Sequence, residues 1–185
     1  MAHLLSFSLL LLAAAATVAA ADPDAWFRAF SRKKEKSAVI RFYLHSAEGG
    51  PEPNLYEVAR SSITATSPTQ FGLVRVLDDK ATADPIRSSP ELGRAQGMIT
   101  SADLREPAVA VAINVVFTAG PYNGSTVCVA GRNPIGIPRG RELAILGGTG
   151  IFRMARGYLI ENTYSFEPVE RYFVFENTLY VRYYD

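Results

Sequence analysis

The amino-acid sequence predicts an all-β protein, a closed antiparallel β-barrel of eight strands. The first observation is an alternating run over residues 109–118 with two largely apolar faces. One face carries Val109, Val111, Ile113, Val115 and Phe117, and the other carries Ala110, Ala112, Asn114, Val116 and Thr118. A long strand that is apolar on both faces suits a sheet that closes on itself. The second observation is that turn signals recur between such runs, which is typical of antiparallel strands.

The expected elements follow one another with little else between them. A short helix is predicted around residues 24–30. Strands are predicted near 37–45, 55–63, 71–78, 94–104, 109–118, 125–130, 141–146, 151–166 and 170–184. The turn signals that separate them are Gly49-Gly-Pro51, Ser67-Pro68, Asp84-Pro85, Glu106-Pro107, Tyr122-Asn-Gly124 and the stretch from Gly131 to Gly140. A barrel of eight strands has a lumen that either side chains or one small ligand can fill.

The N-terminal segment indicates a secreted protein. Residues 1–21 contain a Leu/Ala-rich run and end in Ala19-Ala20-Ala21, which is typical of a secretory signal peptide and its cleavage site. The apolar run is too short to span a membrane. We therefore expect a signal peptide over 1–21, a single barrel domain over 22–185, and a mature protein with no membrane anchor.

The charge of the chain argues against nucleic acid as a partner. The sequence has 19 Lys and Arg against 18 Asp and Glu, and none of these lies in residues 1–21, so the mature net charge stays at +1. Phosphate binding requires clustered cations. The one basic run, residues 32–36, is interpreted as a solvated segment rather than a polyanion site.

Few residues are available for conventional catalysis. Without the signal peptide, His45 is the one histidine and Cys128 the one cysteine. A zinc site or a Ser-His-Asp triad needs more than this, so no metal and no cofactor is expected. Cys128 is predicted to be a buried, inert thiol. Asp78 and Asp79 are interpreted as a strand end and turn, and Gly147-Gly-Thr-Gly150 as a tight turn rather than a phosphate loop.

Several motifs in a fixed order carry a resemblance. They are Tyr56-Glu-Val-Ala59, Ser67-Pro-Thr-Gln-Phe-Gly72, Asp78-Asp79, Gly93-Arg-Ala-Gln-Gly97, Phe117-Thr-Ala-Gly-Pro-Tyr-Asn-Gly-Ser-Thr126, Gly131-Arg-Asn-Pro134, Arg141-Glu142 and Gly147-Gly-Thr-Gly-Ile-Phe-Arg-Met-Ala-Arg-Gly-Tyr158. In this order and spacing the chain resembles the dirigent family of plants, over roughly residues 36–184. The resemblance implies the same small barrel.

The resemblance also implies a function. Dirigent proteins hold phenolic radicals or quinone methides in one orientation, so that coupling or ring closure gives one stereoisomer, and they carry out no redox chemistry themselves. It implies an external oxidase, a laccase or peroxidase, as the radical source, and a location in the extracellular space, the apoplast. We also expect a homo-oligomer, a trimer or dimer, because the outward faces of the strands are apolar.

Site residues are carried over by position. The family's polar and aromatic site positions correspond here to Ser46, Asn133, Ile99 and Arg141, and the arginine alone is retained. If position 46 faces the lumen, strand alternation places Leu44 and Phe42 there as an apolar wall. Arg141 is expected to anchor a phenolic oxygen; the alternative is an ion pair with a neighbouring strand at the barrel rim.

Three functions remain open on the sequence. The first, which we favour over the other two, is stereoselective radical coupling in lignan or phenylpropanoid biosynthesis. The second is ring closure of a quinone methide of the pterocarpan synthase type, which needs a proton acceptor that neither Ser46 nor Asn133 supplies. The third is a wall or defence protein that binds phenolics without stereocontrol. Asn123, in an Asn-Gly-Ser turn, is the predicted glycosylation site.

Overall fold

The computed structural model describes residues 22–184; the predicted signal peptide, residues 1–21, lies outside the described residues. The chain divides into two units between Lys33 and Lys34. In the first, helix α1 (Pro23–Ala29) is capped by Asp22, whose side chain accepts a hydrogen bond from the backbone N–H of Asp24, and a 3-10 turn, η1 (Phe30–Arg32), follows. The predicted short helix is confirmed. Within residues 22–184 no helix is long and apolar enough to cross a membrane.

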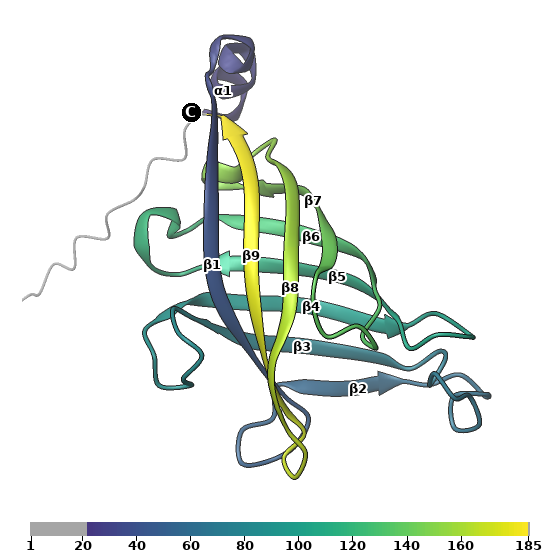
Figure 1. The fold of residues 1–185 in the computed structure, drawn as a ribbon. Coiled ribbons are helices and arrows are strands. Elements are labelled where there is room, and N and C mark those ends of the chain that lie inside the picture. Colours follow the sequence, from purple (N-terminus) through teal and green to yellow (C-terminus); the bar gives the residue numbers. More distant parts are fainter. Residues whose placement is uncertain (1–21, 185) are drawn as a thin grey trace, which may run out of the picture. The chain divides into compact units, whose positions relative to one another are not determined.

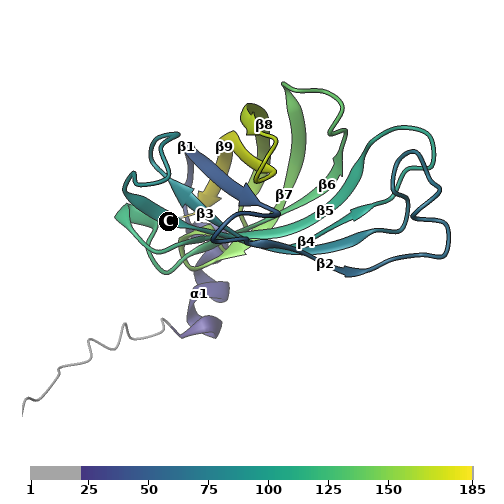
Figure 2. The ribbon, with the colours of Figure 1, turned by 90° about the horizontal axis from the view of Figure 1, so that it is seen from below.

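The second unit is a barrel of antiparallel strands (Figure 1). The strands are β1 (Glu35–Ala47), β2 (Leu55–Ala59), β3 (Val74–Thr82), β4 (Glu91–Ser101), β5 (Val109–Phe117), β6 (Thr126–Asn133), β7 (Arg141–Thr149), β8 (Arg156–Glu167) and β9 (Tyr172–Tyr184). They pair in the order β1-β9-β8-β7-β6-β5-β4-β3-β2, and β1 also pairs with β3. Strands β1, β9 and β8 therefore lie across the lumen from β4–β6 (Figure 2).

Strand β3 closes the barrel by pairing with two strands along one edge. Its residues 74–77 pair with β2 and its residues 80–82 pair with β1. Eight strands form the closed ring and β2 flanks it, which confirms the predicted eight-stranded barrel. The expected end of β3 at residue 78 is wrong, because the strand continues to Thr82. Asp78 stays in the strand because its side chain accepts hydrogen bonds from Arg94 and Gln96 of β4.

Aromatic side chains fill one end of the lumen. Phe117 ends the inward face of β5, and its ring lies 5.6 Å from that of Phe152. Tyr122 and Tyr183 pack on Phe152 at 5.1 and 5.5 Å between ring centroids. The alternation of β5 is confirmed, since its odd-numbered residues are buried. The other end of the lumen is therefore the part that remains available to a ligand.

Cys128 does not lie in the core. Its neighbours Val127 and Val129 are buried, whereas Cys128 is half-buried on the outer face of β6 and its thiol donates to Asn114 Oδ1 at 2.9 Å. The predicted buried thiol is wrong because strand alternation assigns Cys128 to the face opposite the two valines.

The glycine-rich segment at 147–150 belongs partly to a strand. Strand β7 continues to Thr149, and the turn is the short 3-10 helix η3 (Gly150–Phe152). A β-carbon at Gly148 would collide with the backbone carbonyl oxygen of Thr126 on β6. Glycine is needed at position 148 because two strands approach each other closely there. Since β7 continues through this residue, the turn is shorter than expected.

His45 links the three strands that meet at the barrel closure. Its Nε2 lies 2.7 Å from Thr82 Oγ1 of β3, and its Nδ1 lies 2.5 Å from the Tyr172 hydroxyl of β9. The Thr82 hydroxyl donates to the Asp84 carbonyl, so its oxygen accepts from Nε2–H, and Tyr172 donates to Nδ1. Burial, with the nearby cations Lys80 and Arg87, lowers the pKa of His45 to about 4. The folded protein therefore holds a neutral imidazole.

Acidification is expected to weaken the fold through His45. Between about pH 6.5 and 4 the unfolded chain takes up a proton that the folded chain refuses, so stability falls as the pH falls through this window, by up to about 3 kcal/mol. Urea titrations across this range should show the loss in the wild type and a smaller loss in His45→Gln. Parallel curves for the two proteins would show that His45 does not titrate in this way.

Candidate functional site

The open end of the barrel contains a cavity of about 340 Å³. This is at the small end of the range of about 300–1,000 Å³ for small-molecule sites. Its apolar wall consists of Leu44, Leu55, Leu77, Ile99, Val109, Val111, Ile113, Ile135, Leu143, Phe173 and Phe175. Its polar residues are Glu48, Arg75, Asp79, Asn133, Arg141, Glu161 and Thr163. A mostly apolar cavity with a few grouped polar side chains is typical of a site for one aromatic molecule.

The structure places four of the six predicted substrate-binding residues on the cavity wall: Leu44, Ile99, Asn133 and Arg141. Phe42 and Ser46 are buried in the barrel but do not line the cavity. Ser46 instead lies within hydrogen-bonding reach of Asp79. Contact with a substrate stays a prediction for all six.

Arg141 forms the ion pair that was the alternative to a substrate contact. It begins β7 directly opposite Glu161 of β8, and its Nη2 donates to Glu161 Oε1 at 2.9 Å. Its Nη1 donates to the carbonyl of Ile137 and to Thr163 Oγ1, at 2.7 and 2.9 Å. The guanidinium also lies 5.6 Å from the ring centroid of Phe175. Arg141 is 3% exposed, so it is held rigidly within the wall of the cavity.

Asn133 completes this group. Its Nδ2 donates to the same Glu161 oxygen at 2.8 Å. Its Oδ1 is buried and has no hydrogen-bond partner among residues 22–184. Because an unsatisfied buried acceptor is costly, this carbonyl oxygen is available to a hydroxyl group of a ligand.

Asp79 is the acid that sequence reasoning missed. It lies in the middle of β3, is 3% exposed and faces the cavity, and its Oδ1 has no partner within the described chain. Burial raises the pKa of the Asp79 carboxyl well above its ordinary value; the Ser46 hydroxyl opposes this rise and Glu161 adds to it. The interpretation of Asp79 as a turn residue is therefore wrong. The available signal was the alternation of Arg75, Leu77 and Asp79 along one face.

This arrangement combines a buried acid, whose pKa is raised by burial, with a fixed cation. A carboxylic acid kept neutral near pH 7 donates a hydrogen bond or a proton, and the same group accepts the proton back. Glu161, a second acid missed by sequence reasoning, neutralises Arg141. Among residues 22–184 no group of three or more His, Cys, Asp or Glu side chains is placed to hold a metal ion.

Comparisons with known proteins show which family the sequence is similar to. The sequence profile described as "Dirigent-like protein" matches residues 38–182. Dirigent protein 21 of Arabidopsis thaliana is 42% identical over 149 residues, which cover 80% of this chain and 78% of that protein. Pterocarpan synthase 1 of Glycine max is 36% identical, with 82% of each protein covered.

A solved structure gives the same result. It is that of a pterocarpan synthase dirigent protein, which is 36% identical and superposes with a TM-score of 0.77, covering 83% of this chain and 93% of that one. The matched residues 38–182 include all nine strands, the eight of the barrel and the flanking β2, apart from the terminal residues of β1 and β9. The chain therefore belongs to the dirigent family.

Proposed function

We propose that this protein binds a phenolic radical or quinone methide in the barrel cavity and fixes its orientation, so that coupling gives one stereoisomer. The observation that carries this proposal is the mostly apolar cavity at the open end of the barrel, with Asp79, Asn133 and Arg141 on its wall. A planar ring lies against the aliphatic wall while its oxygen is held by the polar group. An energy difference of about 2.7 kcal/mol between two orientations is enough for about a hundredfold preference.

The first candidate reaction is coupling of phenoxy radicals of the coniferyl alcohol type. The radicals are supplied by an external one-electron oxidase, a laccase or peroxidase, and the protein contributes orientation. A cavity of about 340 Å³ holds one phenylpropanoid unit, so one face of the bound radical stays covered by the wall. The second radical then attacks the face that remains open.

The second candidate, ring closure, is favoured by Asp79. Its acid donates a proton to a benzylic hydroxyl, which leaves as water while a para or ortho phenol loses its proton and a quinone methide forms. A second phenolic hydroxyl of the same molecule then adds to the methide carbon and gives its proton to the Asp79 carboxylate, while the methide oxygen takes back from solvent the proton that the first phenol had released there. The net change is loss of one water. Neither Ser46 nor Asn133, the positions considered on the sequence, supplies a group for these proton transfers. The relatives named pterocarpan synthase also support this candidate.

One pair of assays separates the candidates. Purified protein is incubated with coniferyl alcohol and a one-electron oxidant, and separately with a 4-hydroxyisoflavan and no oxidant; products are resolved by chiral chromatography. Enantiomeric excess in the first assay supports coupling, and turnover in the second supports ring closure. Phenolic binding with neither activity would leave the wall or defence role, and absence of binding would refute the proposal.

The outer face of the barrel supports self-association. Paired positions on successive strands form a continuous apolar belt of Val39, Tyr56, Val76, Met98, Ala112, Ala130, Ala144, Tyr158 and Tyr180. Most of these side chains are exposed in the single chain, including Met98 at 49%. A continuous apolar surface of this kind is typical of an interface between subunits.

We expect the mature protein to be a trimer, or else a dimer, at micromolar concentration. Ala112→Lys, which adds a charge to the middle of the apolar belt, should shift it toward the monomer because the lysine would be buried unpaired in the interface. Sedimentation velocity measures both proteins. A monomeric wild type would contradict the expected oligomer.

Secretion to the apoplast and glycosylation complete the proposal. Asn123 is exposed in the turn after the 3-10 helix η2 (Gly120–Tyr122), next to the aromatic end of the lumen. A glycan there leaves the cavity end uncovered. Protein secreted from plant cells should begin near Asp22 and lose mass on glycosidase treatment. The Asn123→Gln variant should keep its mass in the same treatment. An intact Met1 on the secreted protein would exclude the signal peptide.

A further inference from the structure

The mouth of the cavity carries a second polar group, separate from Asp79 and Arg141. Glu48, Leu55 and Arg75 line both the cavity and a neighbouring surface groove of about 200 Å³. These residues therefore stand at the boundary between the cavity and the outside. Arg171, from the turn between β8 and β9, lies on the groove side of the same boundary.

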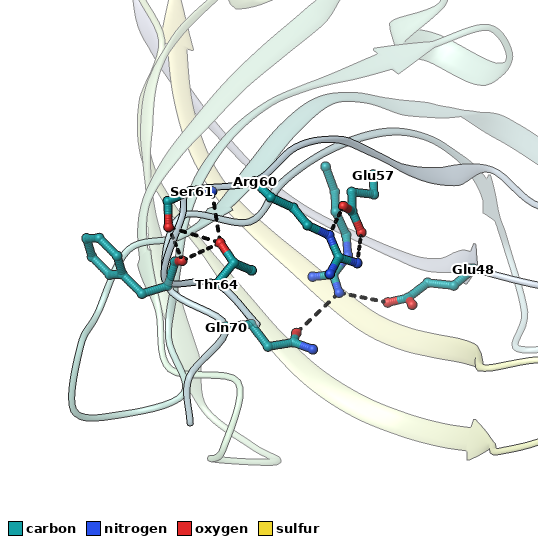
Figure 3. A network of polar contacts seen from close by, with 8 residues as sticks. Glu48, Glu57, Arg60, Ser61, Thr64 and Gln70 are labelled. Atoms are coloured by element: carbon teal, nitrogen blue, oxygen red, sulfur yellow. Dashed lines mark hydrogen bonds and ion pairs between the residues drawn. The ribbon is translucent and has the colours of Figure 1, made fainter. Parts of the chain in front are cut away.

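This group has one more cation than it has anions. Glu48 Oε2 lies 2.6 Å from an Arg171 nitrogen, while its other oxygen lies 3.7 Å from Arg75 Nη2. Arg75 Nη2 also donates a long hydrogen bond of 3.4 Å to Gln70 Oε1. Figure 3 shows Glu48 and Gln70 of this group, with Glu57 and Arg60 beside them. The nearby Arg60 is neutralised by Glu57. Two guanidinium groups thus share one carboxylate, and the stronger contact goes to Arg171.

Arg75 is a partly buried cation with few and long contacts among residues 22–184. Its side chain is 13% exposed, and a guanidinium has five N–H donors. Arg141, the other arginine of the cavity, shows the contrast: it donates to Glu161, Ile137 and Thr163 at distances of 2.7 to 2.9 Å. A largely buried guanidinium whose contacts are this long favours an anionic partner that accepts two hydrogen bonds.

Backbone strain surrounds this group. Three non-glycine residues among 22–184 have a left-handed φ, and two of them are Gln70 at 56° and Arg171 at 50°. Each conformation costs free energy, and it persists only where the surrounding structure holds the residue in place. Both side chains contact the Glu48–Arg75 pair. The strained turns therefore place Gln70 beside Arg75 and Arg171 beside Glu48.

We infer that the cavity takes a phenolic molecule that carries a carboxylate at its other end, and that Arg75 binds this carboxylate. The inference rests on the proposed function, because it names the class of ligand for the same cavity. Arg75, Leu77 and Asp79 lie on one face of β3, with about 13 Å of strand between the first and the last. A cation, an apolar surface and a buried carboxyl group with an unpartnered oxygen, in this order, match a carboxylate, a planar chain and ring, and a phenolic oxygen.

The test compares two ligands of equal shape, 4-hydroxycinnamate and 4-hydroxycinnamyl alcohol. Their dissociation constants are measured by calorimetry near neutral pH for the full mature protein, for Arg75→Gln and for Arg60→Gln. The wild type should bind the acid at least roughly tenfold more tightly than the alcohol, because the carboxylate gains charge-assisted hydrogen bonds. Arg75→Gln should reduce this ratio to about one, whereas Arg60→Gln, whose partner is Glu57 outside the cavity, should keep it.

The outcomes separate this inference from the proposed function. Wild-type protein that binds both ligands equally would overturn the carboxylate site and leave phenolic binding in place. A preference for the acid that survives Arg75→Gln would also overturn it. Wild-type protein that binds neither ligand would overturn the proposed function and this inference with it.

Discussion

Arg141→Ala is expected to destabilise the protein by about 3–5 kcal/mol, because it leaves the Glu161 carboxylate buried without its cation. Asn133 alone would then hydrogen-bond that oxygen. Urea denaturation of the wild type and the variant measures the loss. The matched control is Arg132→Ala, whose guanidinium is 51% exposed and pairs with Asp103 and Glu106 at the surface, where a change below about 1 kcal/mol is expected.

A double variant tests the physical reason for this loss. Arg141→Met combined with Glu161→Leu removes both charges together and should regain much of the stability, since no unpaired charge remains buried. It should also lose phenolic binding if Arg141 anchors the ligand. An Arg141→Ala variant as stable as Arg132→Ala would contradict the buried ion pair.

Asp79→Asn is expected to lower the rate of ring closure by about 10²–10⁴-fold, because the amide neither donates nor accepts the proton. Its effect on stability should have the opposite sign. The raised pKa of Asp79 means that the folded chain keeps a proton that the unfolded chain loses above about pH 4. The wild type therefore loses stability relative to Asp79→Asn as the pH rises above that value.

The neighbouring acid provides the control for Asp79. Asp78→Asn changes a side chain on the outer face that binds Arg94, and should leave turnover at the wild-type level. Rates come from single-turnover product analysis and stabilities from urea midpoints between pH 4 and 8. Full activity in Asp79→Asn would remove the acid from the mechanism and favour the coupling or wall-protein roles.

The barrel could be predicted from the sequence because the signals for its strands and turns lie in short local patterns of residues. The alternation of β5 sets which side chains face the lumen, and turn signals mark the strand ends. The motif resemblance located Arg141 and Asn133, and both line the cavity. Alternation within β6, if it had been applied, would also have placed Cys128 outside.

The acids of the site could not be found in this way. Two adjacent aspartates favour a turn by local propensity. Asp79 nevertheless remains in β3, because Asp78 accepts a hydrogen bond from Arg94 of β4 and the next residues, 80–82, pair with β1 to close the barrel. The pairing of Glu161 with Arg141 depends on the register between β7 and β8. Both features arise from contacts between distant segments, which a single sequence does not show.

The central claim is that the cavity itself holds and orients the phenolic intermediate. The most direct test fills it: Val111→Trp places an indole in the lumen, and Ala110→Trp places the same group on the outer face of the same strand. Enantiomeric excess is measured in oxidative coupling of coniferyl alcohol with each folded variant. The proposal predicts selectivity for the wild type and Ala110→Trp and a racemic product for Val111→Trp; undiminished selectivity in Val111→Trp would contradict it.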